Sequence, residues 1–333
     1  AQSVAVGVKA LNANTTGSNS SAFGFCALAS GTTASLNTAI GNFALRDTQN
    51  GCKNTAVGYQ SMLDATSADC NVALGAYSLA NNTTADLNTA LGACSMYTND
   101  TGANNVAVGY SSLYSTTGSN NTAVGLNALV SSQGTNDSTA IGMRALCSQT
   151  TGSNNTSVGY SSMCGVTTGV CNTSIGRLSG RITSTGDNNA SLGYDANPSA
   201  FGSDNQITLG NSNNNNLRCA DTSISTLSDL RDKTNVEDIP HGLDYILALR
   251  PVKFDWETRD GSRKGKKDYG FIAQELDKVE TDFGSAEYTK LVHKDNPEKW
   301  EADPMKTYPI LIKAIQELKT QNDNLITRIE TLE

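Results

Sequence analysis

The chain has 333 residues, of which 6% are aromatic and 17% charged, and its formal net charge is −8. This mild acidity argues against nucleic acid or an anionic membrane surface as a partner, because both attract basic proteins. The sequence contains no run of 18 apolar residues, so we expect no membrane insertion.

Glycine recurs through the first 210 residues at intervals of 17, with one interval of 16. The recurring positions are Gly7, Gly24, Gly41, Gly58, Gly75, Gly92, Gly109, Gly125, Gly142, Gly159, Gly176, Gly193 and Gly210. A fixed period of this size indicates a solenoid or a fibrous array rather than a globular enzyme. The first residues already lie within a repeat, so we expect a piece of a longer fibre without a signal peptide, its attachment end missing.

Each glycine is the last residue of a similar motif, such as Asn-Thr-Ala-Ile-Gly at 37–41. Leu or Met stands four residues after the glycine in the first ten repeats: Leu11, Leu28, Leu45, Met62, Leu79, Met96, Leu113, Leu129, Leu146 and Met163. Short β-branched runs between Gly and Asn are strand and turn signals. We therefore predict a mainly β chain in which each repeat is one coil of two short strands. Identical residues would stack about 4.8 Å apart, with Asn and Thr in hydrogen-bonded ladders.

The apolar content of one coil is small: the residue before the glycine and the Leu or Met after it. Such a thin core predicts that burial is shared with neighbouring chains. Small residues beside both positions, such as Ala39 and Ala44, would let another chain approach closely. We predict a homotrimeric β-solenoid fibre, and both a bundle of separate rolls and an intertwined triple β-helix satisfy the pattern.

The composition changes near residue 220. Residues 1–220 contain 7 Lys and Arg, 9 Asp and no Glu, whereas residues 221–333 contain 17 basic and 23 acidic residues. Both Trp, both His and five of the six Pro also lie in the second part, as is usual in a globular domain. We predict a shaft at 1–220 and a small α+β domain at 221–333.

The second part has its own order of elements. We predict a helix at 242–249, strands at 252–256 and 269–272 joined by a basic loop at 260–267, a helix at 274–279 and a strand at 288–292. From residue 309 a heptad pattern predicts a coiled-coil helix over 309–333. Its seam residues are Leu311, Ile315, Leu318, Asn322, Leu325, Ile329 and Leu332. Taken alone this seam favours a dimer, whereas the shaft favours a trimer.

All eight Cys lie in the shaft or at its edge, without a CxxC pair, so we expect neither a zinc site nor a cofactor. Cys147 and Cys164 occupy the same position in adjacent coils, where their thiols could meet. We interpret the thiols as reduced and structural, because free Cys is a good small buried residue.

Four motifs of the second part, in order, carry a resemblance: 228–233 (SDLRDK), 249–256 (LRPVKFDW), 270–275 (GFIAQE) and 312–318 (IKAIQEL). They resemble the intramolecular chaperone auto-processing domain that ends many phage tail fibres and tailspikes, including endosialidases. The resemblance covers about residues 222–333. It implies a virion fibre that is assembled in the host cytoplasm and then releases its tail. The repeats separately resemble the β-roll heads of trimeric autotransporter adhesins.

The resemblance also implies a site. Three tails would assemble, nucleate folding of the fibre and cut themselves off between Leu227 and Ser228, with Ser228 as nucleophile and Lys233 as its base. The candidates for a supporting role are Asp229, Arg231, Gln274 and Glu275. A lysine is a base only when neutral, which requires burial or a cationic neighbour such as Arg231. Residues five apart face different directions on a helix or strand, so Ser228 and Lys233 can meet only across a turn or between chains.

Two other functions fit parts of the sequence. An adhesive rod would bind host-surface glycans or a receptor through its Asn and Thr ladders, with the tail as a trimerisation cap. A glycan-cleaving tailspike would need paired carboxylates, one with a raised pKa. The shaft has no Glu, and most Asp residues are out of phase. Asp47 shares a phase with Asp64, as Asp69 does with Asp86, which is typical of exposed turn tips.

Overall fold

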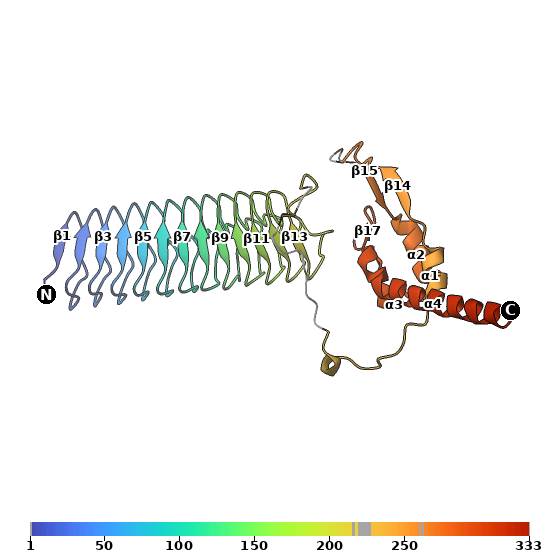
Figure 1. Cartoon of the computed structure of the whole chain (residues 1–333). Helices are drawn as coiled ribbons and strands as arrows, with labels where there is room; N and C mark the ends of the chain where they lie inside the picture. Colours follow the sequence, from blue (N-terminus) through green and yellow to red (C-terminus); the bar gives the residue numbers. More distant parts are fainter. Residues whose placement is uncertain (1, 215–216, 219–227, 260, 262, 333) are drawn as a thin grey trace. The chain divides into compact units, whose positions relative to one another are not determined.

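The computed structural model describes residues 2–214, 217–218, 228–259, 261 and 263–332. Its contacts divide the chain into Ala1–Asn211 and Ser212–Glu333, which we call the shaft and the tail (Figure 1). The boundary expected at residue 220 and the expected scissile residue Leu227 both fall outside the described residues.

The shaft is a β-solenoid, as the repeats predict. Thirteen three-residue strands form one parallel sheet in chain order, each coil adding one strand (Figure 1). The strands are β1 (Val4–Val6), β2 (Ser21–Phe23), β3 (Thr38–Ile40), β4 (Thr55–Val57), β5 (Val72–Leu74), β6 (Thr89–Leu91), β7 (Val106–Val108), β8 (Thr122–Val124), β9 (Thr139–Ile141), β10 (Thr156–Val158), β11 (Thr173–Ile175), β12 (Ala190–Leu192) and β13 (Ile207–Leu209). Equivalent residues pair, as Ala39 does with Ala56. The coils of one chain thus pair with one another, which is the architecture of a separate roll.

The expectation of two strands per coil is wrong, because the described coils contain one strand each and otherwise turns. These turns are held to the next coil by backbone hydrogen bonds: the Leu28 N–H, for example, donates to the Ala44 carbonyl at 3.0 Å. The φ angle of Leu28 is 49°, in the left-handed region. A backbone in that region cannot extend into a pleated strand.

The core of the shaft contains fewer large side chains than the sequence suggests, because only one of the two apolar positions in each coil is turned inward. The Leu or Met four residues after the glycine is buried in nine successive coils, from Leu28 to Met163, whereas Leu11 of the first coil is half-buried. Ala39 and Ala44 are equally buried inside their own coil, so the prediction that such small residues admit another chain is wrong. The residue before each glycine instead points outward, because side chains alternate along a strand and the middle residue faces the core.

We call the outward-facing residues before the thirteen glycines the pre-glycine line. It consists of Val6, Phe23, Ile40, Val57, Leu74, Leu91, Val108, Val124, Ile141, Val158, Ile175, Leu192 and Leu209.

The expected ladders are present. The Asn54 N–H donates to Asn37 Oδ1 at 2.8 Å, and Asn54 Nδ2 donates to the Ala68 carbonyl at 2.6 Å. On the outside, Thr66 Oγ1 donates to the Thr83 carbonyl of the next coil at 3.0 Å. Buried amides are thereby paired in most coils, which avoids the cost of unsatisfied polar groups in a thin core.

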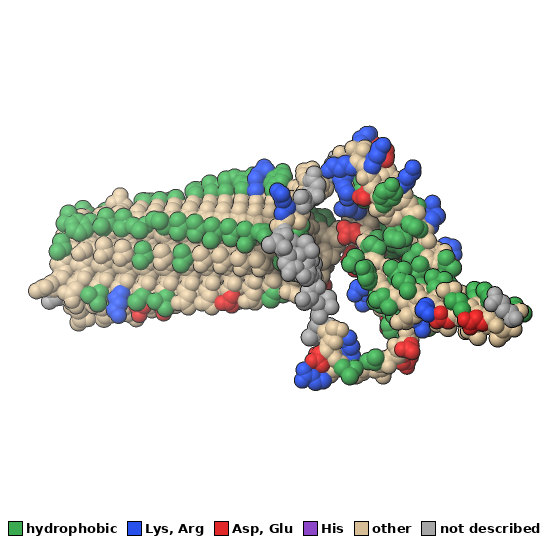
Figure 2. Space-filling view, in the orientation of Figure 1, with side chains coloured by type: hydrophobic (Ala, Val, Ile, Leu, Met, Phe, Trp, Pro, Cys, Tyr) green, Lys and Arg blue, Asp and Glu red, His purple; other side chains and the backbone are tan. Residues whose placement is uncertain are grey.

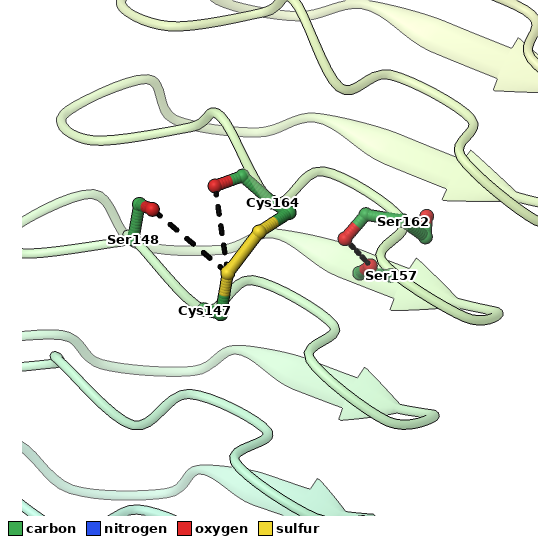
Figure 3. Close-up of a disulfide and its surroundings, with 5 residues drawn as sticks. All are labelled: Cys147, Ser148, Ser157, Ser162 and Cys164. Carbon is green, nitrogen blue, oxygen red and sulfur yellow. Dashed lines mark hydrogen bonds between the residues drawn. A yellow bond between two sulfur atoms is a disulfide. The ribbon is translucent and has the colours of Figure 1, made fainter.

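One pair of cysteines corrects the interpretation that all thiols are reduced. Cys147 and Cys164 form a disulfide with a Cα–Cα distance of 4.9 Å, drawn in Figure 3. Adjacent coils place equivalent residues at a separation that a disulfide can span. Free thiols remain at Cys26, Cys52, Cys70, Cys94 and Cys171. Close to the disulfide in Figure 3, Ser157 Oγ donates to the Ser162 carbonyl at 2.9 Å.

The tail is a small α+β unit, as predicted. Helix α1 (Leu243–Ala248) precedes an antiparallel hairpin of β14 (Val252–Asp255) and β15 (Lys267–Gly270), which α2 (Ala273–Asp282) follows. Helix α4 (Tyr308–Glu330) confirms the expected C-terminal helix. No described helix combines the length and the apolar character needed to cross a membrane.

The strand predicted at 288–292 is wrong. Helix α3 (Ala286–Thr289) occupies most of it and ends at Lys290, whose φ is 47°. Only β16 (Val292–His293) is extended there, paired with β17 (Glu301–Ala302), and the short helix η2 (Pro304–Thr307) leads into α4.

Two buried or half-buried carboxylates hold the tail together. Glu280, 2% exposed, accepts hydrogen bonds of 2.6 Å from Thr289 Oγ1 and from the Leu291 N–H. Glu317 on α4 accepts one of 2.7 Å from the Leu243 N–H at the start of α1. The apolar core beside them consists of Tyr245, Leu276, Val279, Leu291 and Ile310. These contacts fix α1, α2 and α4 against one another.

Candidate active site

A single turn at the beginning of the tail forms the centre of the candidate site. The 3-10 helix η1 (Leu230–Asp232) begins after Asp229, whose Oδ1 accepts the Arg231 N–H at 2.9 Å. At its end the Lys233 N–H donates to the Leu230 carbonyl at 3.2 Å. An Asp at this position satisfies a free N–H of the first turn, which favours the turn over an extended chain.

This turn brings Ser228 and Lys233 together. Lys233 Nζ lies 2.7 Å from Ser228 Oγ and donates a hydrogen bond to it. The distance is within the range in which a base can take a proton from a nucleophile. Both side chains are exposed in the single chain.

Arg231 contacts Asp229 and not Lys233 in the described structure. Its Nε donates to Asp229 Oδ1 at 3.0 Å, and its terminal nitrogen lies 2.6 Å from Oδ2. The side-chain hydrogen bonds from Arg231, together with its backbone N–H, lower the pKa of Asp229 below its usual value. The positive charge of Arg231 is thus paired with Asp229 and is not directed at Lys233. Of the two ways to favour a neutral lysine, a cationic neighbour and burial, burial is the one that remains.

The other two candidates lie on α2, in a second cluster. Glu275 forms a forked ion pair with Arg250, whose Nε donates to Glu275 Oε2 at 2.9 Å. This hydrogen bonding lowers the pKa of Glu275. Gln274 is exposed. No contact seen among the described residues joins Gln274 or Glu275 to Ser228 or Lys233.

Arg250 is the residue that sequence reasoning missed. It belongs to the 249–256 motif and lies, with Glu275, beside a small hollow between α1 and α2. The apolar residues of the hollow are Ala248, Leu249, Phe271, Ile272, Leu276 and Val279. The position of Arg250 beside Pro251, within a motif that carries the family resemblance, was the only sign of its importance in the sequence. The sequence did not indicate that Glu275 is its ion-pair partner.

The carboxylates of the shaft have structural partners. Asp69 Oδ1 accepts the Cys52 N–H at 2.6 Å, and Asp86 Oδ1 accepts the Asp69 N–H at 2.7 Å. These bonds join one coil to the next.

Asp47 and Asp64 both pair with Arg46, at 2.5 and 3.9 Å from its terminal nitrogen. Burial raises the pKa of Asp64, and the neighbouring Asp47 raises it further. The pair therefore has one feature of a glycan-cleaving site, a carboxyl with a raised pKa, but both carboxyl groups form ion pairs with Arg46.

Comparison with protein families decides the nature of the tail. Residues 228–285 match the family described as the chaperone of endosialidase. The chain carries an endosialidase-type intramolecular chaperone domain after a β-solenoid. The matched segment begins at Ser228 and includes Lys233, Arg250 and Glu275, whereas the motif at 312–318 lies outside it. No curated protein and no solved structure matches the chain.

The family consists of self-cleaving serine peptidases that act as C-terminal chaperones in trimeric fibres. Its presence implies a phage fibre or tailspike component.

Proposed function

We propose that this chain is a segment of a homotrimeric virion fibre whose tail drives trimerisation and folding and then cuts itself off between Leu227 and Ser228. Ser228 is the nucleophile and Lys233 its base. The observation that carries the proposal is the 2.7 Å contact between Lys233 Nζ and Ser228 Oγ, at the first residues of the family match. The shaft then remains on the virion as the host-attachment rod.

The proposed reaction has two steps. Neutral Lys233 takes the hydroxyl proton of Ser228, and Oγ attacks the Leu227 carbonyl carbon. The bond between that carbon and the Ser228 nitrogen breaks as Lys233 returns the proton to the nitrogen, which leaves an ester between Leu227 and Ser228. Water then hydrolyses the ester, releasing a carboxylate at Leu227 and a free amine and hydroxyl at Ser228.

Assembly supplies what the single chain lacks. A lysine is more easily neutral when buried, and the dyad of one chain is exposed. The heptad residues of α4 are exposed as well, Leu311 at 41% and Ile329 at 58%. An exposed apolar seam of this kind is stable in water when it packs against other helices. Packing of three tails would thus bury apolar helix faces and cover the dyad, so that cutting follows assembly.

The test uses the full chain with four substitutions followed by denaturing electrophoresis. Ser228→Ala and Lys233→Ala should leave the chain whole, whereas Thr234→Ala, next to the turn and outside the dyad, should be cut normally. Lys233→Arg separates the two roles of a lysine, because arginine keeps the charge but does not become a neutral base in proteins. We expect it to remain uncut. Cutting of Lys233→Arg would contradict the role of Lys233 as base.

If all variants and the native chain form trimers that stay whole, the tail is a trimerisation cap and the chain an adhesive rod.

A further inference from the structure

The pre-glycine line is an exposed apolar surface that the fold leaves uncovered. Nine of its thirteen residues are at least 36% exposed, from Leu74 at 36% to Val6 at 56%, and the other four are half-buried valines. Figure 2, which views the strand side of the shaft, shows a continuous row of hydrophobic side chains along its length.

The size of this surface matches that of a protein interface. At roughly 70 Å² for each of the nine exposed side chains and less for the four half-buried valines, the line offers on the order of 700 Å² per chain, close to the roughly 800 Å² that each partner buries in a stable interface. Apolar patches of more than a few hundred Å² on soluble proteins usually mark contact sites. A line that continues through all thirteen coils therefore requires an occupant.

The shape and chemistry of the pre-glycine line indicate which partner can cover it. The line follows the straight stack of coils (Figure 1), has one residue per coil and contains no polar or charged residue. A partner that covers it must be equally straight and must present apolar groups at the same spacing. A second copy of this chain meets both conditions, and no charge within the line opposes its approach. The small residues expected to form the contact, such as Ala39 and Ala44, are buried in their own coil and are not accessible.

We propose that copies of the shaft pack side by side, in the same register, through the pre-glycine line. The proposal rests on the self-association that the proposed function includes. It adds the surface through which the shafts meet.

The test places the photo-crosslinker p-benzoylphenylalanine at Ile141, which is 41% exposed in the line. The matched control places it at Gln133, an exposed turn residue of the same coil. The same replacement at Leu91, 45% exposed, repeats the test in another coil, so that a local misfit at one position does not decide the outcome. Each full-length variant is sedimented to measure its oligomeric state, irradiated and analysed on a denaturing gel, and the cross-linked peptides are identified by mass spectrometry.

We expect trimers by sedimentation, with cross-links between chains from positions 141 and 91 and none from 133. The linked peptides should come from the same coil of the neighbouring chain. Trimers without cross-links at 141 and 91, or with links to a distant coil, would overturn the inference and leave the proposed function standing. Monomers would overturn both, because the shared premise of self-association would then be wrong.

Discussion

Glycine at the end of each strand determines the path of the shaft. Gly92 has a φ of 138°, and a Cβ there would lie 2.6 Å from the Gly109 carbonyl oxygen. Other residues rarely adopt this φ, and the backbone of the next coil cannot move away without breaking its own hydrogen bonds. The glycine period is therefore a requirement of coil stacking.

Substitution of this glycine should strongly destabilise the shaft. We expect Gly92→Ala to lower the free energy of unfolding by about 3 kcal/mol, because the strained φ and the steric overlap add. Gly134→Ala is the control, since a Cβ at Gly134 meets no atom within 4 Å. Chemical unfolding followed by circular dichroism measures both. Equal midpoints for the two variants would show that the contact at Gly92 relaxes without cost.

The contact between Ser228 and Lys233 illustrates the limit of reasoning from residues alone. A spacing of five favours neither a helix face nor a strand face, and the pair meets only because η1 folds back after Asp229. The motifs of the tail pointed to these residues through a resemblance. The pairing of Arg250 with Glu275 depends on how α1 and α2 pack, which no local pattern encodes.

At the scale of elements, the second segment of each coil was predicted as a strand and is a series of turns. Apolar residues such as Leu28 and Met62 stand at φ of about 50° in this segment, which is contrary to the intrinsic preference of bulky side chains. Hydrogen bonds to the next coil and full burial stabilise that conformation. Stacking of coils is a long-range effect, so the glycine period predicted the solenoid but not the number of strands in a coil.

The ion pair between Arg250 and Glu275 joins the end of α1 to α2 and gives the tail a dependence on pH. Because the pKa of Glu275 is lowered in the folded tail, the pair stabilises the fold above the usual carboxyl pKa. That stabilisation is lost as the pH falls through the lowered value.

We expect Arg250→Gln to reduce the melting temperature of the tail at neutral pH and to have no effect once Glu275 is protonated. Lys253→Gln removes the same charge at an exposed residue for which the described chain shows no ion pair, and serves as the control. Melting curves of both full-length variants, recorded from neutral to strongly acidic pH, measure the effect. A difference for Arg250→Gln that persists at low pH would contradict the electrostatic origin.

At the scale of the whole molecule, the repeats create a problem of alignment. A slip of one coil returns most side chains of the shaft to equivalent positions, so that chains packing side by side have many nearly equal registers. A domain that aligns three chains before the shafts pack removes this ambiguity. The chaperone domain after the solenoid has that role in our account.

Removal of the tail tests the role directly. We expect residues 1–220, expressed alone, to aggregate, because exposed strand edges and slow long-range pairing favour wrong association. As a control, the same fragment is co-expressed with the full-length Ser228→Ala chain, which keeps its tail and can supply the chaperone domain. Soluble trimers of the fragment by sedimentation would contradict the chaperone role.

The most direct test of the central claim is the intact mass of the products of the assembled native chain. Self-cleavage by Ser228 and Lys233 predicts two fragments, 227 residues ending at Leu227 and 106 residues beginning with Ser228. Both should be absent from Lys233→Arg. A native trimer with only the mass of the whole 34.9 kDa chain, or fragments cut at any other bond, would contradict it.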